Sequence, residues 1–185
     1  VGAGKVLRDH DARRAALFHA ASDNGPNAAP LVMAHLQVLP GWIDYNGHLR
    51  DAYYTLVFSQ AIDALMDEVG LDEAYRASSA CTLFTLETHI HYLHEVKASD
   101  TISVRARAIG VDAKRLHLGL ALHCTRLAEP AAVGECMLLH VQQLPEPKGA
   151  TFPFAILQRL TSWLAADQQL PPLAPGSRRM ELPRR

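Results

Sequence analysis

A short polar segment, residues 44–48, contains side chains that could do acid–base or nucleophilic chemistry. It reads Asp44, Tyr45, Asn46, Gly47 and His48, so that a carboxylate, an amide and an imidazole lie within five residues. A carboxylate can attack a carbonyl carbon or activate a water molecule, and turns on a rigid scaffold are where such groups concentrate. Asp, Asn and Gly are also common turn formers. Composition alone therefore favours a purely structural turn, and further observations are needed to assign chemistry to it.

The elements around this segment predict how it is positioned. A strand is predicted over residues 32–39, where Pro40 and Gly41 end it. A long helix is predicted from Asp51 to Gly70, and glycine is a common C-terminal stop. Its apolar residues recur at three- and four-residue steps and predict one buried stripe: Tyr54, Val57, Phe58, Ala61, Ile62, Leu65 and Val69. The polar segment should thus lie at the start of a buried helix.

Beyond this helix the hydrophobic pattern changes to a period of two. Alternation predicts strands over residues 83–96, 101–109, 115–126 and 131–143, followed by a second helix over 152–166. The clearest case is residues 116–122, where every second residue is leucine. Strands with one apolar face are typical of an antiparallel sheet. The order predicts an α+β fold in which an antiparallel sheet wraps around the long helix.

The predicted domain organisation has three parts. Residues 31–145 form the main domain. Residues 1–30 are an N-terminal extension, either a short helix over about residues 8–21 with a linker or a disordered leader. Residues 146–185 hold the second helix and a tail in which Pro171, Pro172 and Pro175 disfavour regular structure.

Composition narrows the class of protein. The chain has 185 residues, 49% hydrophobic and 20% charged, with a formal net charge of −1. This is typical of an ordinary soluble globular protein and gives no electrostatic reason to expect nucleic acid or an anionic membrane as partner. Its apolar runs are shorter than the roughly 18 residues expected of a membrane span. The three cysteines show no CxxC spacing, which disfavours a disulfide framework or a zinc finger and favours the cytoplasm.

The segment from Asp44 to Tyr54 resembles the signature of the 4-hydroxybenzoyl-CoA thioesterase family of hotdog proteins. That signature is an Asp, two residues, a Gly, often a His, and then a Tyr near the start of the central helix. Here Asp44, Gly47, His48 and Tyr54 match it, and the order of elements extends the resemblance to about residues 32–143. The resemblance implies a hotdog fold and hydrolysis of a small acyl-CoA thioester. Coenzyme A would be part of the substrate, and no separate cofactor or metal is expected.

A narrower resemblance concerns residues 42–48 and 87–92. Trp42-Ile43-Asp44-Tyr45-Asn46-Gly47-His48 and Glu87-Thr88-His89-Ile90-His91-Tyr92 are similar to the betainyl-CoA thioesterases of bacterial carnitine breakdown. In some of those proteins the thioesterase follows an L-carnitine dehydrogenase in one chain. This resemblance implies that the acyl group could be betainyl.

The family resemblance implies a role for each residue of the motif. Asp44 would be the catalytic carboxylate, acting as nucleophile or as general base. The backbone amide of Asp51, at the positive end of the long helix, would donate to the oxyanion. Asn46 could orient water or the substrate carbonyl, and His48 could hydrogen-bond to Asp44 or hold the turn. Asp51 departs from the Asn often found there, so its side chain need not take part.

Aromatic residues near the motif could bind a quaternary ammonium through their ring faces. Trp42 and Tyr45 are preferred for this role because they belong to the turn. The full predicted substrate-binding set is Trp42, Tyr45, Tyr53, Tyr54, Glu87 and Tyr92. Glu87 shares a predicted strand face with His89 and His91, and a solvated or interface position is its simpler interpretation.

Three alternatives stay open at this point. His89 and His91 could bind zinc from one strand face, although spacing supplies no third ligand. A non-catalytic hotdog module that binds acyl-CoA is the second, and it would leave Asp44 without a use. A hydratase of the same fold is a third, although the paired Asp and His expected of it are matched only by Asp44 and His48. The resemblance also implies a homodimer or tetramer, because a lone hotdog sheet leaves an edge uncovered.

Overall fold

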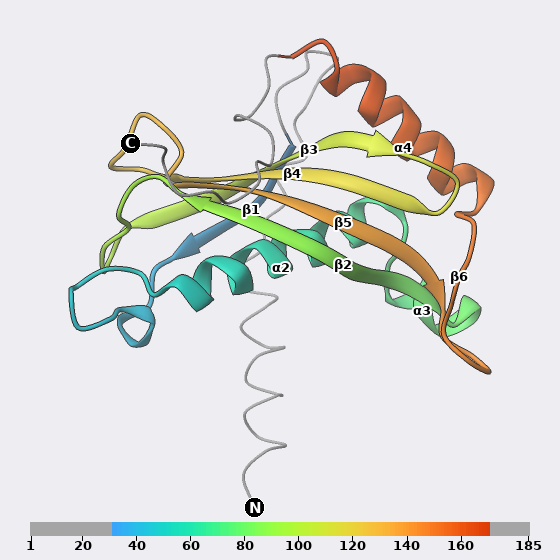
Figure 1. The fold of residues 1–185 in the computed structure, drawn as a ribbon, viewed down its shortest axis with the longest axis horizontal. Helices are drawn as coiled ribbons and strands as arrows, with labels where there is room; N and C mark the ends of the chain where they lie inside the picture. Colours follow the sequence, from blue (N-terminus) through green and yellow to red (C-terminus); the bar gives the residue numbers. More distant parts are fainter. Residues whose placement is uncertain (1–30, 171–185) are drawn as a thin grey trace, which may run out of the picture.

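The computed structural model describes residues 31–170, and its centre is a six-stranded antiparallel sheet. The strands run β1-β3-β4-β5-β2, with β6 paired to β5, and helix α2 lies against one face (Figure 1). The strands are β1 (Leu31–Gln37), β2 (Cys81–Tyr92), β3 (Thr101–Val111), β4 (Arg115–Cys124), β5 (Ala132–Gln142) and β6 (Lys148–Gly149). The helices are η1 (Pro40–Trp42), α2 (Asp51–Val69), α3 (Glu73–Ser79) and α4 (Phe154–Asp167). The predicted extension over residues 1–30 and the tail beyond 170 lie outside the described residues.

Helix α2 is buried along the stripe that its sequence predicts. All seven stripe residues are buried, together with Met66. The helix ends at Gly70, which adopts a φ of 90°, a left-handed conformation that glycine reaches without steric cost. The predicted helix is therefore confirmed to within one residue at its C-terminal end.

The leucine face of β4 belongs to the same buried core as the apolar stripe of α2. Leu116, Leu118, Leu120 and Leu122 are at most 1% exposed, so each contributes roughly 1.5–3 kcal/mol of burial free energy. Gly134 on β5 marks a close approach, because an added Cβ would lie 3.0 Å from Cε2 of Phe58. These contacts hold the helix firmly enough for its first turn to serve as a fixed platform.

Two details depart from the predicted strands. Strand β2 ends at Tyr92 instead of continuing to 96, because residues 93–96 turn away to meet the polar segment. There the Leu49 N–H donates to the Val96 carbonyl at 2.7 Å, and His48 forms a β-bridge with Lys97. The short elements α3 and β6 were not predicted, since seven and two residues are too few for a periodic signal.

Helix α4 lies along β3, next to the segment that β1 leaves uncovered (Figure 1). The pairing of β1 with β3 reaches only to Ala106. The next edge amide, that of Ala108, donates to Asp167 Oδ2 at 2.8 Å. At the opposite side of the sheet formed by residues 31–170, β2 is the terminal strand, with Phe84 and Leu86 exposed. None of the helices in residues 31–170 has the length and hydropathy that a membrane span requires.

Candidate active site

The polar segment folds as a tight turn between η1 and the start of α2. The Asp44 N–H donates to the His48 carbonyl at 2.8 Å, and the Gly47 N–H donates to the Asp44 carbonyl at 3.1 Å. Gly47 has a φ of +81°, a conformation in which an L side chain is strained. Glycine at this position is therefore required by the geometry that brings His48 back beside Asp44.

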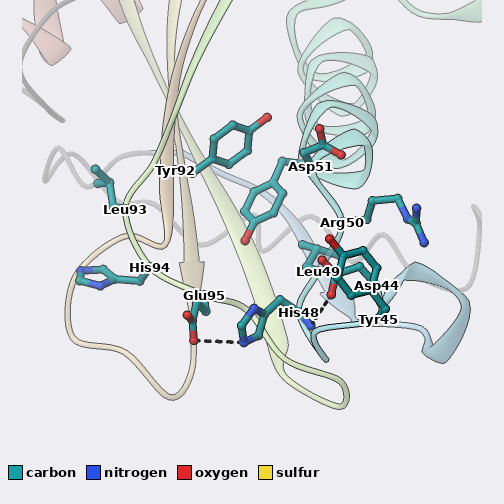
Figure 2. A pocket seen from close by; sticks show the side chains of 11 residues that line it. Asp44, Tyr45, His48, Leu49, Arg50, Asp51, Tyr92, Leu93, His94 and Glu95 are labelled. Atoms are coloured by element: carbon teal, nitrogen blue, oxygen red, sulfur yellow. Dashed lines mark hydrogen bonds and ion pairs between the residues drawn. The ribbon is translucent and has the colours of Figure 1, made fainter. Parts of the chain in front are cut away.

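The Asp44 carboxylate is held by backbone donors. Its Oδ1 accepts a hydrogen bond from the N–H of Asn46 at 2.8 Å. It accepts a second from the N–H of His48 at 3.1 Å (Figure 2). The His48 N–H is the main reason that the pKa of Asp44 lies below its ordinary value of 3.8, and partial burial opposes this shift. Asp44 is consequently ionised at neutral pH, the form in which a carboxylate acts as a nucleophile or base.

A cavity of about 510 Å³ opens beside this carboxylate. Three segments line it: the polar turn, the first turn of α2 and the residues at and after the end of β2 (Figure 2). Its volume is within the range of small-molecule sites. The lining residues are Asp44, Tyr45, His48, Leu49, Arg50, Asp51, Tyr54, Tyr92, Leu93, His94 and Glu95.

The first turn of α2 contains a backbone donor that has no acceptor among the described residues, in a residue that lines this cavity. Arg50, which precedes the helix, makes no side-chain capping bond. The N–H of Ala52 donates to Asp51 Oδ1 at 2.8 Å, and the N–H of Tyr53 donates to the Arg50 carbonyl at 3.0 Å. Within the described chain the Asp51 N–H has no acceptor. An amide with no acceptor at the positive end of a helix is suited to receive an anionic oxygen.

The opposite wall comes from β2 and the residues that follow it. The Tyr92 ring meets the Tyr54 ring edge to face, with centroids 5.1 Å apart and an interplanar angle of 84°. Glu95 Oε2 lies 3.2 Å from His48 Nε2 (Figure 2). Burial is the main reason that the pKa values of both tyrosines are raised. Both hydroxyls therefore stay protonated at neutral pH.

Comparison with known proteins agrees with this architecture. Residues 38–160 match the family described as the thioesterase-like superfamily. The chain belongs to this superfamily. The predicted hotdog fold is thereby confirmed, and so is the predicted relationship to thioesterases.

Two relatives share substantial sequence identity with this chain, and they differ in how much of their own length it matches. It is 48% identical over 134 residues to a betainyl-CoA thioesterase of Pseudomonas aeruginosa, covering 72% of this chain and 84% of that protein. It is 40% identical over 140 residues to an L-carnitine dehydrogenase/betainyl-CoA thioesterase of Agrobacterium fabrum. That match covers 76% of this chain but only 28% of the Agrobacterium protein.

Two solved structures resemble the thioesterase-like fold. A Pseudomonas putida KT2440 protein described as a thioesterase is 41% identical, with a TM-score of 0.71, covering 84% of this chain and 99% of that one. A Staphylococcus aureus protein solved in complex with CoA is 26% identical, with a TM-score of 0.75. The second match covers 86% of this chain and all of the Staphylococcus protein.

The cavity of this thioesterase-like protein brings together only some of the predicted site residues. Asp44, Tyr45, His48, Asp51, Tyr54 and Tyr92 line it. Trp42 and Tyr53 stack on each other instead, with centroids 5.1 Å apart and an angle of 17°, and neither lines the cavity. Asn46 is exposed and contributes its backbone N–H to Asp44. Tyr45, although part of the lining, is 95% exposed.

Glu87 also lies away from this cavity, on the exposed part of β2. Its Oε1 is 2.6 Å from His89 Nε2. Among residues 31–170, no three His, Cys, Asp or Glu side chains are grouped so that they could hold a metal ion. The partner of His89 in the described structure is thus a carboxylate on its own strand.

Five lining residues were not predicted as site residues: Leu49, Arg50, Leu93, His94 and Glu95. The last three were assigned to a strand that was expected to continue to residue 96. A signal was available in the sequence, because the alternation that ends at Tyr92 gives way to Leu93-His94-Glu95-Val96. Their approach to Asp44, however, depends on contacts between segments more than 40 residues apart.

Proposed function

We propose that this thioesterase hydrolyses betainyl-CoA to betaine and coenzyme A, with Asp44 as its catalytic carboxylate. The observation that carries the proposal is that an ionised carboxylate and an available helix N-terminal amide line one cavity. The 48% identity to a betainyl-CoA thioesterase supports the choice of acyl group.

The proposed reaction uses groups whose positions are described above. Asp44 either attacks the thioester carbonyl carbon or takes a proton from a water molecule that attacks it. The negative charge that develops on the carbonyl oxygen is received by the Asp51 N–H, a contribution of about 2.7–4 kcal/mol for one such donor. The C–S bond then breaks; on the nucleophilic route this leaves a mixed anhydride of Asp44, which water hydrolyses to restore the carboxylate, whereas on the general-base route water has already attacked the carbonyl carbon. In both routes water supplies the proton that the departing thiolate takes up to become the thiol of coenzyme A. Water supplies the oxygen of the betaine carboxylate, so no cofactor is required.

His48 and Asn46 are proposed as positioning residues. Their backbone N–H groups hold Asp44 Oδ1, and the His48 side chain connects the turn to Glu95. Both interactions orient the carboxylate without contacting the reacting carbonyl. Tyr54 of α2 and Tyr92 of β2 are proposed to contact the acyl group, because both line the cavity and their rings meet edge to face.

A thiol-release assay over a panel of acyl-CoA thioesters tests this function. Betainyl-CoA, acetyl-CoA and benzoyl-CoA would be compared for the wild type and for Asp44→Asn. We expect the wild type to turn over betainyl-CoA with the highest kcat/KM and the variant to lose that activity. Absence of betainyl-CoA turnover by the wild type would refute the substrate, and an active variant would remove Asp44 from the chemistry. Binding without turnover of any thioester would favour the non-catalytic module.

We also propose that the protein is a homodimer or tetramer in the cytoplasm. Strand β2 is terminal in the described sheet and carries exposed Phe84 and Leu86, and such an edge readily pairs with another chain. Cys81, Cys124 and Cys136 are free thiols, in keeping with a reducing compartment. Light scattering at micromolar concentration tests the assembly, and a monomer would contradict it.

A further inference from the structure

The charges around the cavity suit one class of acyl group. Its lining holds the carboxyl groups of Asp44, Asp51 and Glu95 and only one guanidinium, that of Arg50. Coenzyme A is itself an anion, so an acidic lining opposes substrate binding unless the acyl end brings positive charge. The lining therefore favours a cationic acyl group, and this step rests on the function proposed above.

The covalent structure of a betainyl group limits where its cation can bind. One methylene separates the quaternary nitrogen from the thioester carbonyl carbon. The residues that contact the cation must consequently line the same cavity as Asp44 and the Asp51 amide. The Trp42–Tyr53 stack does not meet this condition, because neither ring lines the cavity.

Tyr54 and Tyr92 do meet it, and they form a fixed aromatic corner. Tyr54 is 4% exposed and is held in the core, whereas Tyr92 lies against it with much of its ring accessible. Aromatic faces attract quaternary ammonium groups through the ring quadrupole. Figure 2 shows the Tyr92 ring directed from β2 toward the start of α2, where Asp51 lies.

Glu95 supplies the charge beside this corner. Its Oε2 is anchored by His48 Nε2 at 3.2 Å, yet 63% of the side chain is exposed. After burial, which has the largest effect, the Glu95 charge is among the causes that raise the Tyr54 pKa, so the carboxylate is electrostatically close to that ring. A quaternary ammonium has no N–H to donate. It needs nearby negative charge and ring faces rather than a directed acceptor.

We propose that Glu95 determines acyl specificity, binding the quaternary ammonium of the substrate together with the rings of Tyr92 and Tyr54. In this arrangement the His48 contact keeps the Glu95 carboxylate beside the turn that carries Asp44. The cation and the thioester carbonyl are then bound at adjacent positions of one cavity.

The test compares betainyl-CoA with tert-butylacetyl-CoA, a neutral thioester of the same shape in which carbon replaces the quaternary nitrogen. The measured quantity is the ratio of the two kcat/KM values. We expect Glu95→Gln to lower this ratio about tenfold, since it removes the charge and keeps the shape, and Tyr92→Leu to lower it about threefold. Glu68→Gln, on the exposed side of α2 and outside the cavity, is the matched control and should leave the ratio unchanged.

The outcomes separate this proposal from the proposed function. Equal losses on both thioesters in Glu95→Gln would show that Glu95 only positions His48, and would overturn the proposal. A wild type that prefers betainyl-CoA, with the preference intact in Glu95→Gln, would overturn the role of Glu95 and leave the function standing. A wild type without any preference for the cation would overturn both.

Discussion

The two ends of helix α2 handle their hydrogen-bonding groups in opposite ways. At the C-terminal end, Gly70 closes the helix, and arginine side chains donate to nearby carbonyls. Arg159 reaches the Val69 carbonyl at 3.2 Å, and Arg76 reaches the Leu71 carbonyl at 2.7 Å. At the N-terminal end Arg50 makes no side-chain capping bond, and Asp51, whose N–H has no acceptor among the described residues, lines a cavity. The carbonyls near the C-terminal end are thus hydrogen-bonded within the protein, whereas the Asp51 N–H at the N-terminal end is available to a ligand.

Two carboxylates show the same contrast. Asp44 and Asp167 each accept hydrogen bonds from backbone N–H groups. The pKa of Asp44 is lowered chiefly by the His48 N–H, whereas burial raises the pKa of Asp167. Asp167 is buried and holds the edge of β3, while Asp44 borders the cavity. The comparison indicates that access and solvation, rather than residue type, distinguish the carboxylate proposed to be catalytic from the buried one that holds the sheet edge.

The largest expected effect is on catalysis at the N-terminal end. Asp44→Asn should slow thiol release by about 10³-fold, because the amide is neither a nucleophile nor a base of useful strength. The free energy of unfolding should change by less than about 0.5 kcal/mol, since the Asn oxygen can accept the same two N–H groups. Thiol-release kinetics and urea unfolding of the same preparation measure both. A large loss of stability would show that Asp44 is structural, as Asp167 is.

The second effect concerns the buried carboxylate. Asp167→Ala should lower the free energy of unfolding by about 1–3 kcal/mol, because the buried Ala108 N–H loses its acceptor. Asp167→Asn keeps an acceptor and should cost less. Because the pKa of Asp167 is raised in the folded state, the wild type loses stability as pH rises from 3.8 through the folded-state pKa. The free energy of unfolding of Asp167→Asn, relative to that of the wild type, should therefore be most favourable at neutral pH. Urea unfolding at several pH values measures this difference. A reduced kcat/KM in Asp167→Asn would contradict the view that Asp167 is purely structural.

The smallest expected effect tests whether backbone hydrogen bonds within a turn are enough to make a carboxylate reactive. Asp112 accepts from the N–H groups of Lys114 and Arg115, much as Asp44 does in its turn, but it does not line the cavity. The Lys114 N–H is the first cause of its pKa being lowered to about 2. Because 42% of the side chain is exposed, its stabilisation after solvent screening should stay below about 1 kcal/mol.

The pH dependence of Asp112→Asn follows from the sign of that shift. A depressed folded-state pKa gives stability that is present above 3.8 and lost as pH falls through about 2. The wild type and the variant should therefore differ in unfolding free energy at pH 6 and converge in strong acid, with equal thiol release at pH 7. A catalytic defect in Asp112→Asn would contradict the view that the cavity confers reactivity.

Local patterns in the sequence determined the scaffold and the position of Asp44. The three- and four-residue spacing from Tyr54 to Val69 predicted α2 because a helix must turn its apolar residues to one side. Alternation of leucines predicted the face of β4 for the corresponding reason in a strand. The motif from Asp44 to His48 is contiguous, so its turn and its place before the helix were visible without a structure.

The far wall of the cavity was decided only by the tertiary structure. Glu95 meets His48 because the chain leaves β2 at Tyr92 and the Leu49 N–H bonds to the Val96 carbonyl, contacts that no periodicity encodes. Trp42, a predicted substrate-binding residue, stacks on Tyr53, which is 11 residues away in sequence and a neighbour in space. Patterns along a chain report which side of an element is buried. Which distant side chains share a cavity depends on how the loops between those elements pack.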